Sequence, residues 1–107
     1  MVASEAVLDA LGNATRRAIV QVLADGPRPV GAIAQELPVS RPAVSQHLRV
    51  LEDAALVAHH SDGTRNVFRL DPQGFAAAQR WLDSFWDEGL ARFAALAEAT
   101  APVGDPS

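Results

Sequence analysis

The chain has 107 residues, 49% of them apolar, which suits one domain with a core of its own. Because the chain contains no cysteine, disulfides, thiol catalysis and thiolate metal sites are excluded. It also has no apolar run long enough to predict a membrane span. The formal charge of −4 is uneven: the first 71 residues carry seven arginines against eight acids, and the rest carry two against five. The first residues lack the basic and apolar segments of a secretory leader, which predicts a cytoplasmic protein.

Two helices are predicted at the start of the chain. Ser4 is a candidate N-cap for a short helix that ends at Gly12. Asn13 is a candidate N-cap for a second helix over 14–24, which Asp25-Gly26-Pro27 stops.

A pair of helices follows. Apolar residues at 30, 33, 34 and 37 predict a third, short helix that Pro38 ends, after a short strand or a turn at Pro29-Val30. Ser40 is the candidate N-cap of a fourth helix with Pro42 in its first turn. The predicted buried stripe of this fourth helix is Val44, Leu48, Leu51 and Ala55, and its polar, basic face is Arg41, Pro42, Ser45, Gln46 and Arg49.

A hairpin and a long helix complete the pattern. The segments 56–61 and 64–70 flank Asp62-Gly63, a dipeptide typical of two-residue turns. Pro72 opens a last helix that runs to about Thr100. Its broad apolar stripe exceeds what one small domain is expected to cover and consists of Phe75, Leu82, Phe85, Trp86, Leu90, Phe93 and Leu96.

This order of elements predicts a mainly α fold with a small β-hairpin wing: a winged helix-turn-helix of about five helices and a two-stranded wing. We expect one DNA-binding and dimerisation domain over residues 1–101 and a flexible tail over 102–107. The exposed face of the fourth helix would enter a major groove about 12 Å wide, with Arg65 beside the tip of the wing.

Three segments resemble the ArsR/SmtB family of bacterial repressors: 11–17 (LGNATRR), 40–48 (SRPAVSQHL) and 63–70 (GTRNVFRL). The most specific run is 44–51 (VSQHLRVL), and the resemblance covers roughly residues 5–98. It implies a homodimer that pairs through its first and last helices on an operator with two half-sites. Ala14 departs from the proline that many members carry.

The resemblance also bears on metals. Metal-sensing members carry a cysteine pair at the third helix or Asp and His ligands on the last helix, and this chain has neither cysteine nor a histidine on its last helix. It therefore resembles the branch that does not sense metals, for which we expect no cofactor and no metal site. An unknown small-molecule effector remains open.

Candidate DNA contacts lie on the fourth helix, on the wing and at the start of the second helix. Arg41, Ser45 and Gln46 are candidates for reading bases, because Arg pairs with guanine and Gln with adenine. Arg49, Arg65, Arg16 and Arg17 are candidates for phosphate contacts, the alternative being surface ion pairs with Glu52, Asp53 or Asp62. The full predicted set is Arg16, Ser40, Arg41, Pro42, Ser45, Gln46, His47, Arg49 and Arg65.

The apolar residues of the first and last helices predict the dimer interface. The candidates are Leu8, Leu11, Leu82, Phe85, Trp86 and Phe93. The alternative is a small-molecule pocket lined by Trp81, Phe85, Trp86 and Phe93, although stripes at helical spacing usually pack.

The three histidines are weaker candidates for a function. His47 flanks the buried stripe of its helix, and His59 and His60 are neighbours on a strand, so they point to opposite faces and cannot chelate one ion together.

No catalytic constellation occurs in the sequence, so we predict no enzyme. We predict a dimeric DNA-binding regulator, a repressor or autorepressor of a palindromic operator. The alternative is a winged-helix module that dimerises without binding DNA, which the acidic net charge favours.

Overall fold

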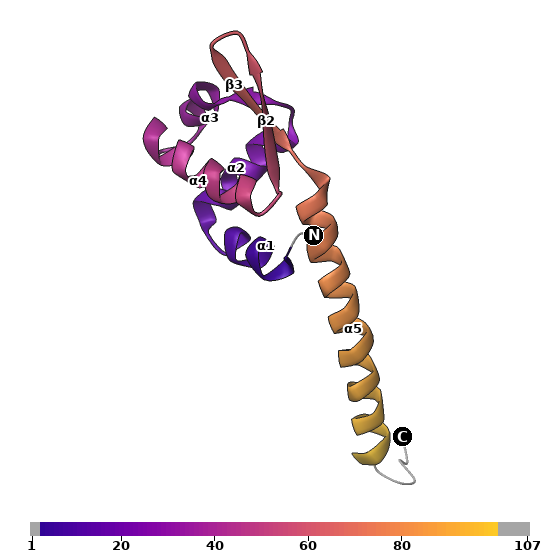
Figure 1. Cartoon of the computed structure of the whole chain (residues 1–107). Coiled ribbons are helices and arrows are strands. Elements are labelled where there is room, and N and C mark those ends of the chain that lie inside the picture. The colour runs from indigo at the N-terminus through magenta and orange to yellow at the C-terminus, as the bar shows by residue number, and fades with distance from the viewer. Residues whose placement is uncertain (1–2, 101–107) are drawn as a thin grey trace.

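The computed structural model describes residues 3–100, which form five helices and a three-stranded antiparallel sheet (Figure 1). The order is α1 (Ser4–Leu11), α2 (Ala14–Ala24), β1 (Arg28–Pro29), α3 (Val30–Glu36), α4 (Arg41–Asp53), β2 (Val57–Asp62), β3 (Arg65–Leu70) and α5 (Pro72–Thr100). The predicted order of elements is confirmed, and the open choice at Pro29 resolves as a strand that pairs with β3. The predicted tail over 102–107 lies outside the described residues.

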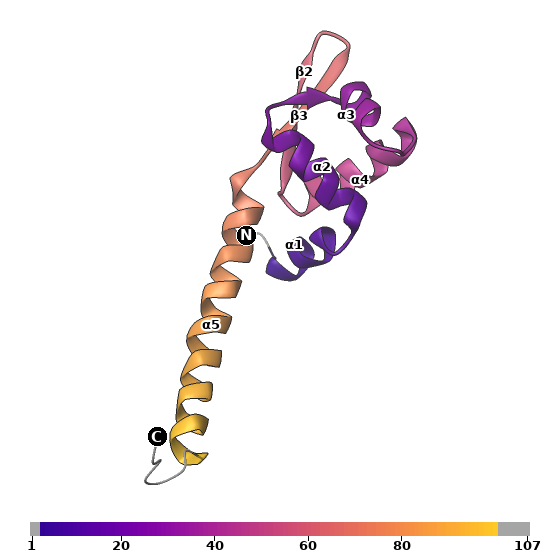
Figure 2. The ribbon, with the colours of Figure 1, turned by 180° about the vertical axis from the view of Figure 1, so that it is seen from behind.

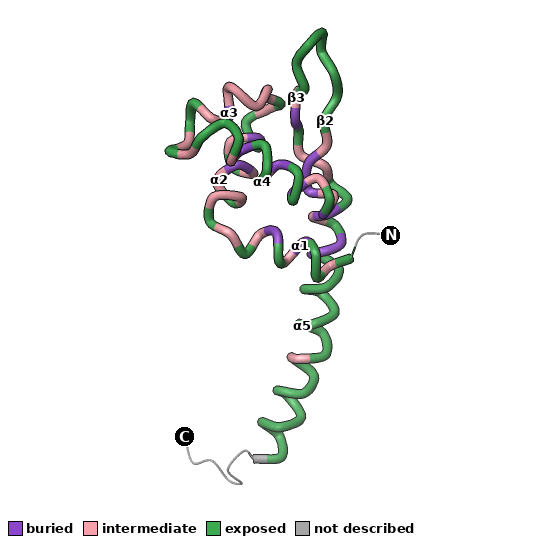
Figure 3. The backbone as a smooth tube through the Cα atoms, turned by 60° about the vertical axis from the view of Figure 1, so that its left-hand side comes forward, coloured by how far each residue is buried: buried purple, intermediate pink, exposed green. Residues whose placement is uncertain are grey.

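Residues 4–71 form a rounded unit that we call the head. Its core lies between the helices and the inner face of the sheet, and the largest fully buried side chains are Ile19, Ile33, Leu48, Leu51 and Leu56. Figure 3 shows the buried residues gathered here. The hairpin is held against the helices, as its marginal stability in isolation requires, because Val57 and Phe68 belong to the same core.

The helix starts follow the capping residues in two of three cases. The Asn13 side chain accepts a hydrogen bond from the Arg16 backbone N–H, and the Ser40 hydroxyl accepts one from Ala43 N–H, so both predicted caps are confirmed. The predicted Ser4 cap is wrong: Ser4 is the first helical residue, and Ala3 occupies the cap position without a side-chain bond.

The corner between α4 and β2 is tighter than the sequence pattern suggested. Ala55 was expected in the buried stripe of the fourth helix, but α4 ends at Asp53 and Ala55 has a φ of +59°. Ala54 is buried in its place. The first turn of α5 packs on this corner, where Gly74 N–H donates to the Ala55 carbonyl at 2.8 Å. This contact fixes the start of α5 against the end of α4.

Replacing Gly74 by alanine should destabilise the fold. A β-carbon at Gly74 would lie 2.6 Å from the Ala55 carbonyl oxygen and 2.8 Å from that of Ala54, and both are backbone atoms that cannot move aside cheaply. Overpacking of this kind costs about 1–3 kcal/mol. Urea unfolding should show that loss for Gly74→Ala, whereas Gln73→Ala at the exposed neighbouring position should change stability by less than about 0.5 kcal/mol. Equal stability of both variants would contradict the tight corner.

The wing turns one residue later than predicted. Asp62 pairs with Arg65, so the two turn residues are Gly63-Thr64 and not Asp62-Gly63. Gly63 has a φ of +64° and Thr64 does not share a positive φ, the pattern of a type II′ turn with glycine first. This register places Ser61, Asn66 and Phe68 on the face of the hairpin that looks toward the helices, because side chains alternate along a strand.

The helix α5 projects far beyond the head (Figures 1 and 2). The molecule measures 71 × 30 × 20 Å, and its radius of gyration is 19.9 Å, against about 13 Å for a compact chain of this length. Ala77 and Ala78 are buried on the head, and α1 lies beside the first turns of α5. Beyond Ala78 most of the described helix is exposed.

Candidate nucleic-acid interface

The polar surface of α4 has two parts that differ in direction. At about 100° per residue, Pro42, Gln46 and Arg49 point away from the buried Val44, Leu48 and Leu51. Arg41 and Ser45 lie on one flank of α4, which faces the wing. All five of these polar-face residues are exposed. An α-helix presented in this way fits the width of a DNA major groove.

A groove of about 230 Å³ separates α4 from the wing tip. Its lining is Pro29, Val30, Arg41, Ser45, Thr64, Arg65 and Asn66. Two guanidinium groups, two hydroxyls and an amide therefore converge on one opening that no acidic side chain lines. Hydrogen-bond donors with positive charge in such a cleft are suited to a phosphodiester.

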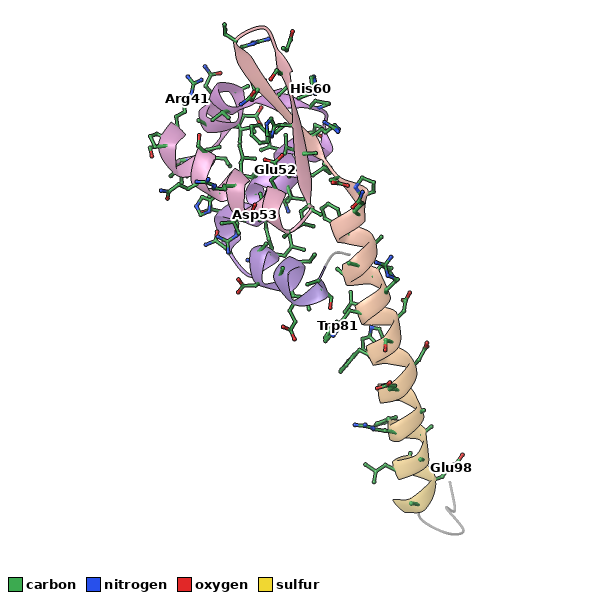
Figure 4. All side chains as sticks on the ribbon, viewed as in Figure 1. Arg41, Glu52, Asp53, His60, Trp81 and Glu98 are labelled. Carbon is green, nitrogen blue, oxygen red and sulfur yellow. The ribbon has the colours of Figure 1, made fainter. Side chains whose placement is uncertain are left out.

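Arg41 is held in this groove by packing. Its guanidinium carbon lies 3.6 Å from the position that a β-carbon on Gly31 would occupy, so the flat group rests over the start of α3. Among residues 3–100 no ion pair or side-chain hydrogen bond involves Arg41. Figure 4 shows it at the wing end of the head, while Glu52 and Asp53 lie toward the other end of α4.

The remaining predicted arginines differ in their partners. Arg65 lies 3.7 Å from Asp62, with both side chains more than 60% exposed, so this pair is loose and leaves Arg65 accessible. Arg49 forms no ion pair with Glu52 or Asp53 in the described part of the chain. Arg16 is engaged: its guanidinium donates to the carbonyls of Ala10 at 2.7 Å and Asp9 at 3.3 Å.

Arg17 behaves like Arg16, because it donates to the Leu11 carbonyl at 2.7 Å. These bonds satisfy carbonyls at the end of α1, a position where a cation is favourable. Both arginines therefore have a structural role that the sequence analysis did not foresee, and a phosphate contact by Arg16 stays a prediction.

Two groove residues were missed by sequence reasoning. Thr64 and Asn66 line the groove, and the amide oxygen of Asn66 accepts a hydrogen bond of 3.4 Å from Ser61. The misplaced turn concealed Thr64, which the predicted boundaries put in the strand. Alternation places Asn66 on the same face as Phe68 with either turn, but only the fold brings that face to the groove beside α4.

The histidines serve different surfaces. His47 is half-buried on the other flank of α4. His59 Nδ1–H donates to a Glu52 carboxylate oxygen at 2.6 Å, and its ring lies 5.0 Å from that of Phe68, so it joins the wing to the end of α4. His60 points to the opposite face of the hairpin, as predicted. Among the residues that the structure describes, no three His, Asp or Glu side chains are grouped as metal ligands.

The second candidate surface lies on α5. Trp81, Leu82, Phe85, Trp86, Leu90, Phe93 and Leu96 are between 39% and 69% exposed. With about 200 Å² for each large side chain, on the order of 700 Å² of apolar surface is left uncovered. A monomer rarely exposes so much in one patch, and the area is close to the roughly 800 Å² that each partner covers in a specific interface.

The candidates on α1 are less open than those on α5. Leu8 and Leu11 are half-buried, and Leu11 packs partly against the core.

No helix among residues 3–100 is long and apolar enough to cross a bilayer.

Comparison with known families and proteins agrees with this geometry. Residues 11–60 match a family model described as a helix-turn-helix domain. The HTH-type transcriptional regulator Rv2034 of Mycobacterium tuberculosis is 54% identical over 90 residues, which cover 84% of each chain.

Two solved structures extend the likeness to the fold. An ArsR-like transcriptional regulator from Rhodococcus sp. RHA1 superimposes with a TM-score of 0.81 at 28% identity, covering 91% of this chain and 92% of that one. The homodimeric winged helix-turn-helix DNA-binding domain Mb0332 from Mycobacterium bovis gives a TM-score of 0.62 at 31% identity, covering 82% of each. The predicted winged helix-turn-helix architecture is thereby confirmed.

Proposed function

Because the chain belongs to the ArsR family of winged helix-turn-helix transcriptional regulators, we propose that it binds a two-fold symmetric operator as a homodimer and represses transcription there. Members of this family regulate transcription and are not enzymes. The observation that carries the proposal is the groove between α4 and the wing, where Arg41 and Arg65 converge without an acidic neighbour in the lining.

We assign the two parts of the α4 surface to different contacts with DNA. Gln46 on the outward face reads a base edge in the major groove, since an amide can bond adenine in two places. The wing tip lies over the adjacent minor groove. The DNA strand between the two grooves then crosses the cleft, so Arg41 holds a phosphate and does not read a base, in contrast to the expectation from sequence.

The acidic net charge does not oppose this assignment. Association with DNA depends on the local distribution of charge more than on its sum. The wing end of α4 carries Arg41, the acids of α4 stand at its last turn, and α5 carries four acids against two arginines. Asp62 at the wing tip lies 3.7 Å from Arg65 and partly offsets it, whereas no acidic side chain lines the groove that holds Arg41.

The proposal is tested by titrating salt against affinity for DNA from upstream of the gene. Three arginines per subunit (Arg41, Arg49 and Arg65) give six phosphate contacts in a dimer. The logarithm of the binding constant should therefore fall with the logarithm of the salt concentration with a slope of about −5. A competition with random DNA measures specificity, and half-sites should lie about one helical turn apart or a multiple of it. Affinity that stays flat with salt, or no DNA binding by a dimer, would support the alternative of a dimerisation module.

Base reading and phosphate binding are separated by two substitutions. Gln46→Ala should lose about 1–3 kcal/mol on the operator and relax the sequence preference, because a bidentate base contact disappears. Arg65→Ala should weaken operator and random DNA by similar factors. Gel-shift or fluorescence-anisotropy titrations with both DNAs measure each ratio. An unchanged preference in Gln46→Ala would mean that α4 is oriented differently in the groove.

Repression follows from the same geometry. A dimer that occupies promoter phosphates and grooves excludes any other protein from them, so no further activity is needed. A reporter fused to the operator should be lowered by the wild-type protein and released in Gln46→Ala.

A further inference from the structure

We propose that the hydrogen bond between His59 and Glu52, which we call the strut, fixes the angle between the wing and α4 and thereby raises the affinity for DNA. The two residues are positioning residues: they contact no DNA themselves and act through Arg65 at the wing tip. This inference rests on the proposed function and adds to it the contact that holds the two sides of the groove in place.

The strut is short and has a defined direction. The Nδ1 atom of His59 lies 2.6 Å from a carboxylate oxygen of Glu52. An ionised carboxylate only accepts hydrogen bonds, so the shared proton belongs to Nδ1. Within the described range 3–100, no other side-chain hydrogen bond or ion pair joins the β2–β3 hairpin to a helix.

The strut lies where the hairpin leaves the head. His59 pairs with Phe68 across the hairpin, and the two rings are 5.0 Å apart. Phe68 belongs to the buried core, whereas no residue of the segment 59–67 is buried. The outer part of the wing therefore has no core contact to fix its direction, and a restraint at its base has to do so.

A small rotation at the strut moves the wing tip by more than a hydrogen bond tolerates. Asp62, the last paired residue before the turn, is three residues from His59, which is about 10 Å at the rise of a strand. A rotation of about 10° at the base then moves the tip by roughly 2 Å, whereas the length of an N–H···O bond varies by only about 0.5 Å. Arg65 pairs with Asp62, so this movement changes its distance from Arg41 across the groove.

The stability of the fold is a poor explanation for the strut. The side chains of His59 and Glu52 are 38% and 35% exposed, and pairs so open to water contribute little to the free energy of folding. Glu52 also lies in the last turn of α4, where an acidic side chain is unfavourable. The bond to the wing is the one contact of this carboxylate in the described chain that favours an acid at this position.

Removing the acceptor gives a result opposite in sign to the one that charge alone predicts. Glu52→Ala removes a negative charge, which by itself would strengthen binding to DNA. Loss of the strut should instead weaken affinity for the operator about five- to tenfold in fluorescence-anisotropy titrations. Asp53→Ala is the matched control, because it removes the same charge from the exposed neighbouring residue. It should bind at least as tightly as the wild type.

Conservative variants should restore the affinity. Glu52→Gln keeps an oxygen acceptor, and His59→Asn keeps an N–H donor in the place of Nδ1. Both should bind within about threefold of the wild type, whereas His59→Ala should resemble Glu52→Ala. Equal losses in the conservative and the alanine variants would show that the hydrogen bond is not what matters.

Coupling to Arg65 separates a positioning role from a general structural one. In a protein that already carries Arg65→Ala, the wing tip no longer holds a phosphate, so Glu52→Ala should change affinity by less than about twofold. Residues that act through one contact give such non-additive effects, whereas independent effects multiply. Losses that multiply would mean that the strut does not act through the wing.

Spin labels test the strut without DNA, because the chain has no cysteine of its own. Labels at Thr64→Cys on the turn and Gln21→Cys on α2, in subunits diluted with unlabelled protein, report the position of the wing tip relative to the head. The distance distribution should become at least twice as broad in Glu52→Ala and stay unchanged in Asp53→Ala.

The outcomes separate the strut from the proposed function. A Glu52→Ala protein with an unchanged distance distribution, or with an operator affinity equal to that of Asp53→Ala, would overturn the strut and leave the DNA-binding function intact. A wild-type protein that binds no DNA would contradict the proposed function and, with it, the effect of the strut on affinity.

Discussion

Trp86→Asp should convert the protein to a monomer at micromolar concentration and abolish tight operator binding. Trp86 is 54% exposed on α5, so pairing would cover about half of the indole and contribute about 1–2 kcal/mol in each subunit. The substitution removes both contributions and places two carboxylates in the same apolar surface, where each ion costs several kcal/mol. The dimer dissociation constant should rise by at least about 1,000-fold, which corresponds to roughly 4 kcal/mol.

Sedimentation velocity measures this change, and circular dichroism shows whether the head remains folded. The head should be unaffected, because Trp86 lies beyond the part of α5 that packs on it. Ala91→Asp is the matched control: it adds the same charge to the exposed opposite side of α5 and should leave a dimer. A wild-type monomer, or a dimeric Trp86→Asp variant, would mean that α5 does not pair through this surface.

The elements that the sequence predicted well are those whose ends are set by local chemistry. Asn13 and Ser40 cap their helices because their side-chain oxygens satisfy backbone N–H groups three residues ahead. The uncovered stripe of α5 was also predictable, since helical spacing reveals a face whatever covers it. The order of elements predicted the winged helix-turn-helix as a whole, and a resemblance across most of the chain supported it.

What the sequence did not reveal depends on contacts between distant segments. Ala55 was expected inside α4, but it follows the end of α4 in a left-handed conformation. Its carbonyl accepts a hydrogen bond from the backbone N–H of Gly74, a contact between distant segments that the sequence pattern does not show. Asp62-Gly63 resembled a turn by composition, and the pairing of Asp62 with Arg65 moved the turn by one residue. That shift places Thr64 in the turn, where it lines the groove.

The roles of the arginines show the same limit. Arg16 and Arg41 are alike in a charge count, yet one binds carbonyls at the end of α1 and the other lies unpaired in the groove within the described chain. Only the fold places Ala10 beside the first and Gly31 beneath the second. The region of the candidate DNA interface was therefore predictable from the sequence, whereas the role of each side chain in it was not.

Arg41→Glu should cause the largest loss of DNA affinity of any single change in the head. A charge-assisted hydrogen bond to phosphate is worth about 1.5–3 kcal/mol, and a dimer would lose two, so affinity for the operator should fall by roughly 100- to 10,000-fold. Random DNA should lose affinity by a similar factor, because a phosphate carries no sequence information. The steepness of the salt dependence should decrease by about 2.

Arg69→Glu is the matched control for Arg41→Glu. Arg69 is an exposed arginine of β3 on the outer face of the hairpin, outside the groove lining, and its replacement changes the net charge equally. Arg69→Glu should reduce affinity for DNA only through the general electrostatic field of the protein. This reduction should disappear near about 0.5 M salt, because charges more than a few ångströms apart are then screened. Comparable losses in both variants would show that net charge and not the groove governs binding. A loss confined to the operator in Arg41→Glu would show that Arg41 on α4 reads a base after all, as the sequence analysis expected from the pairing of arginine with guanine.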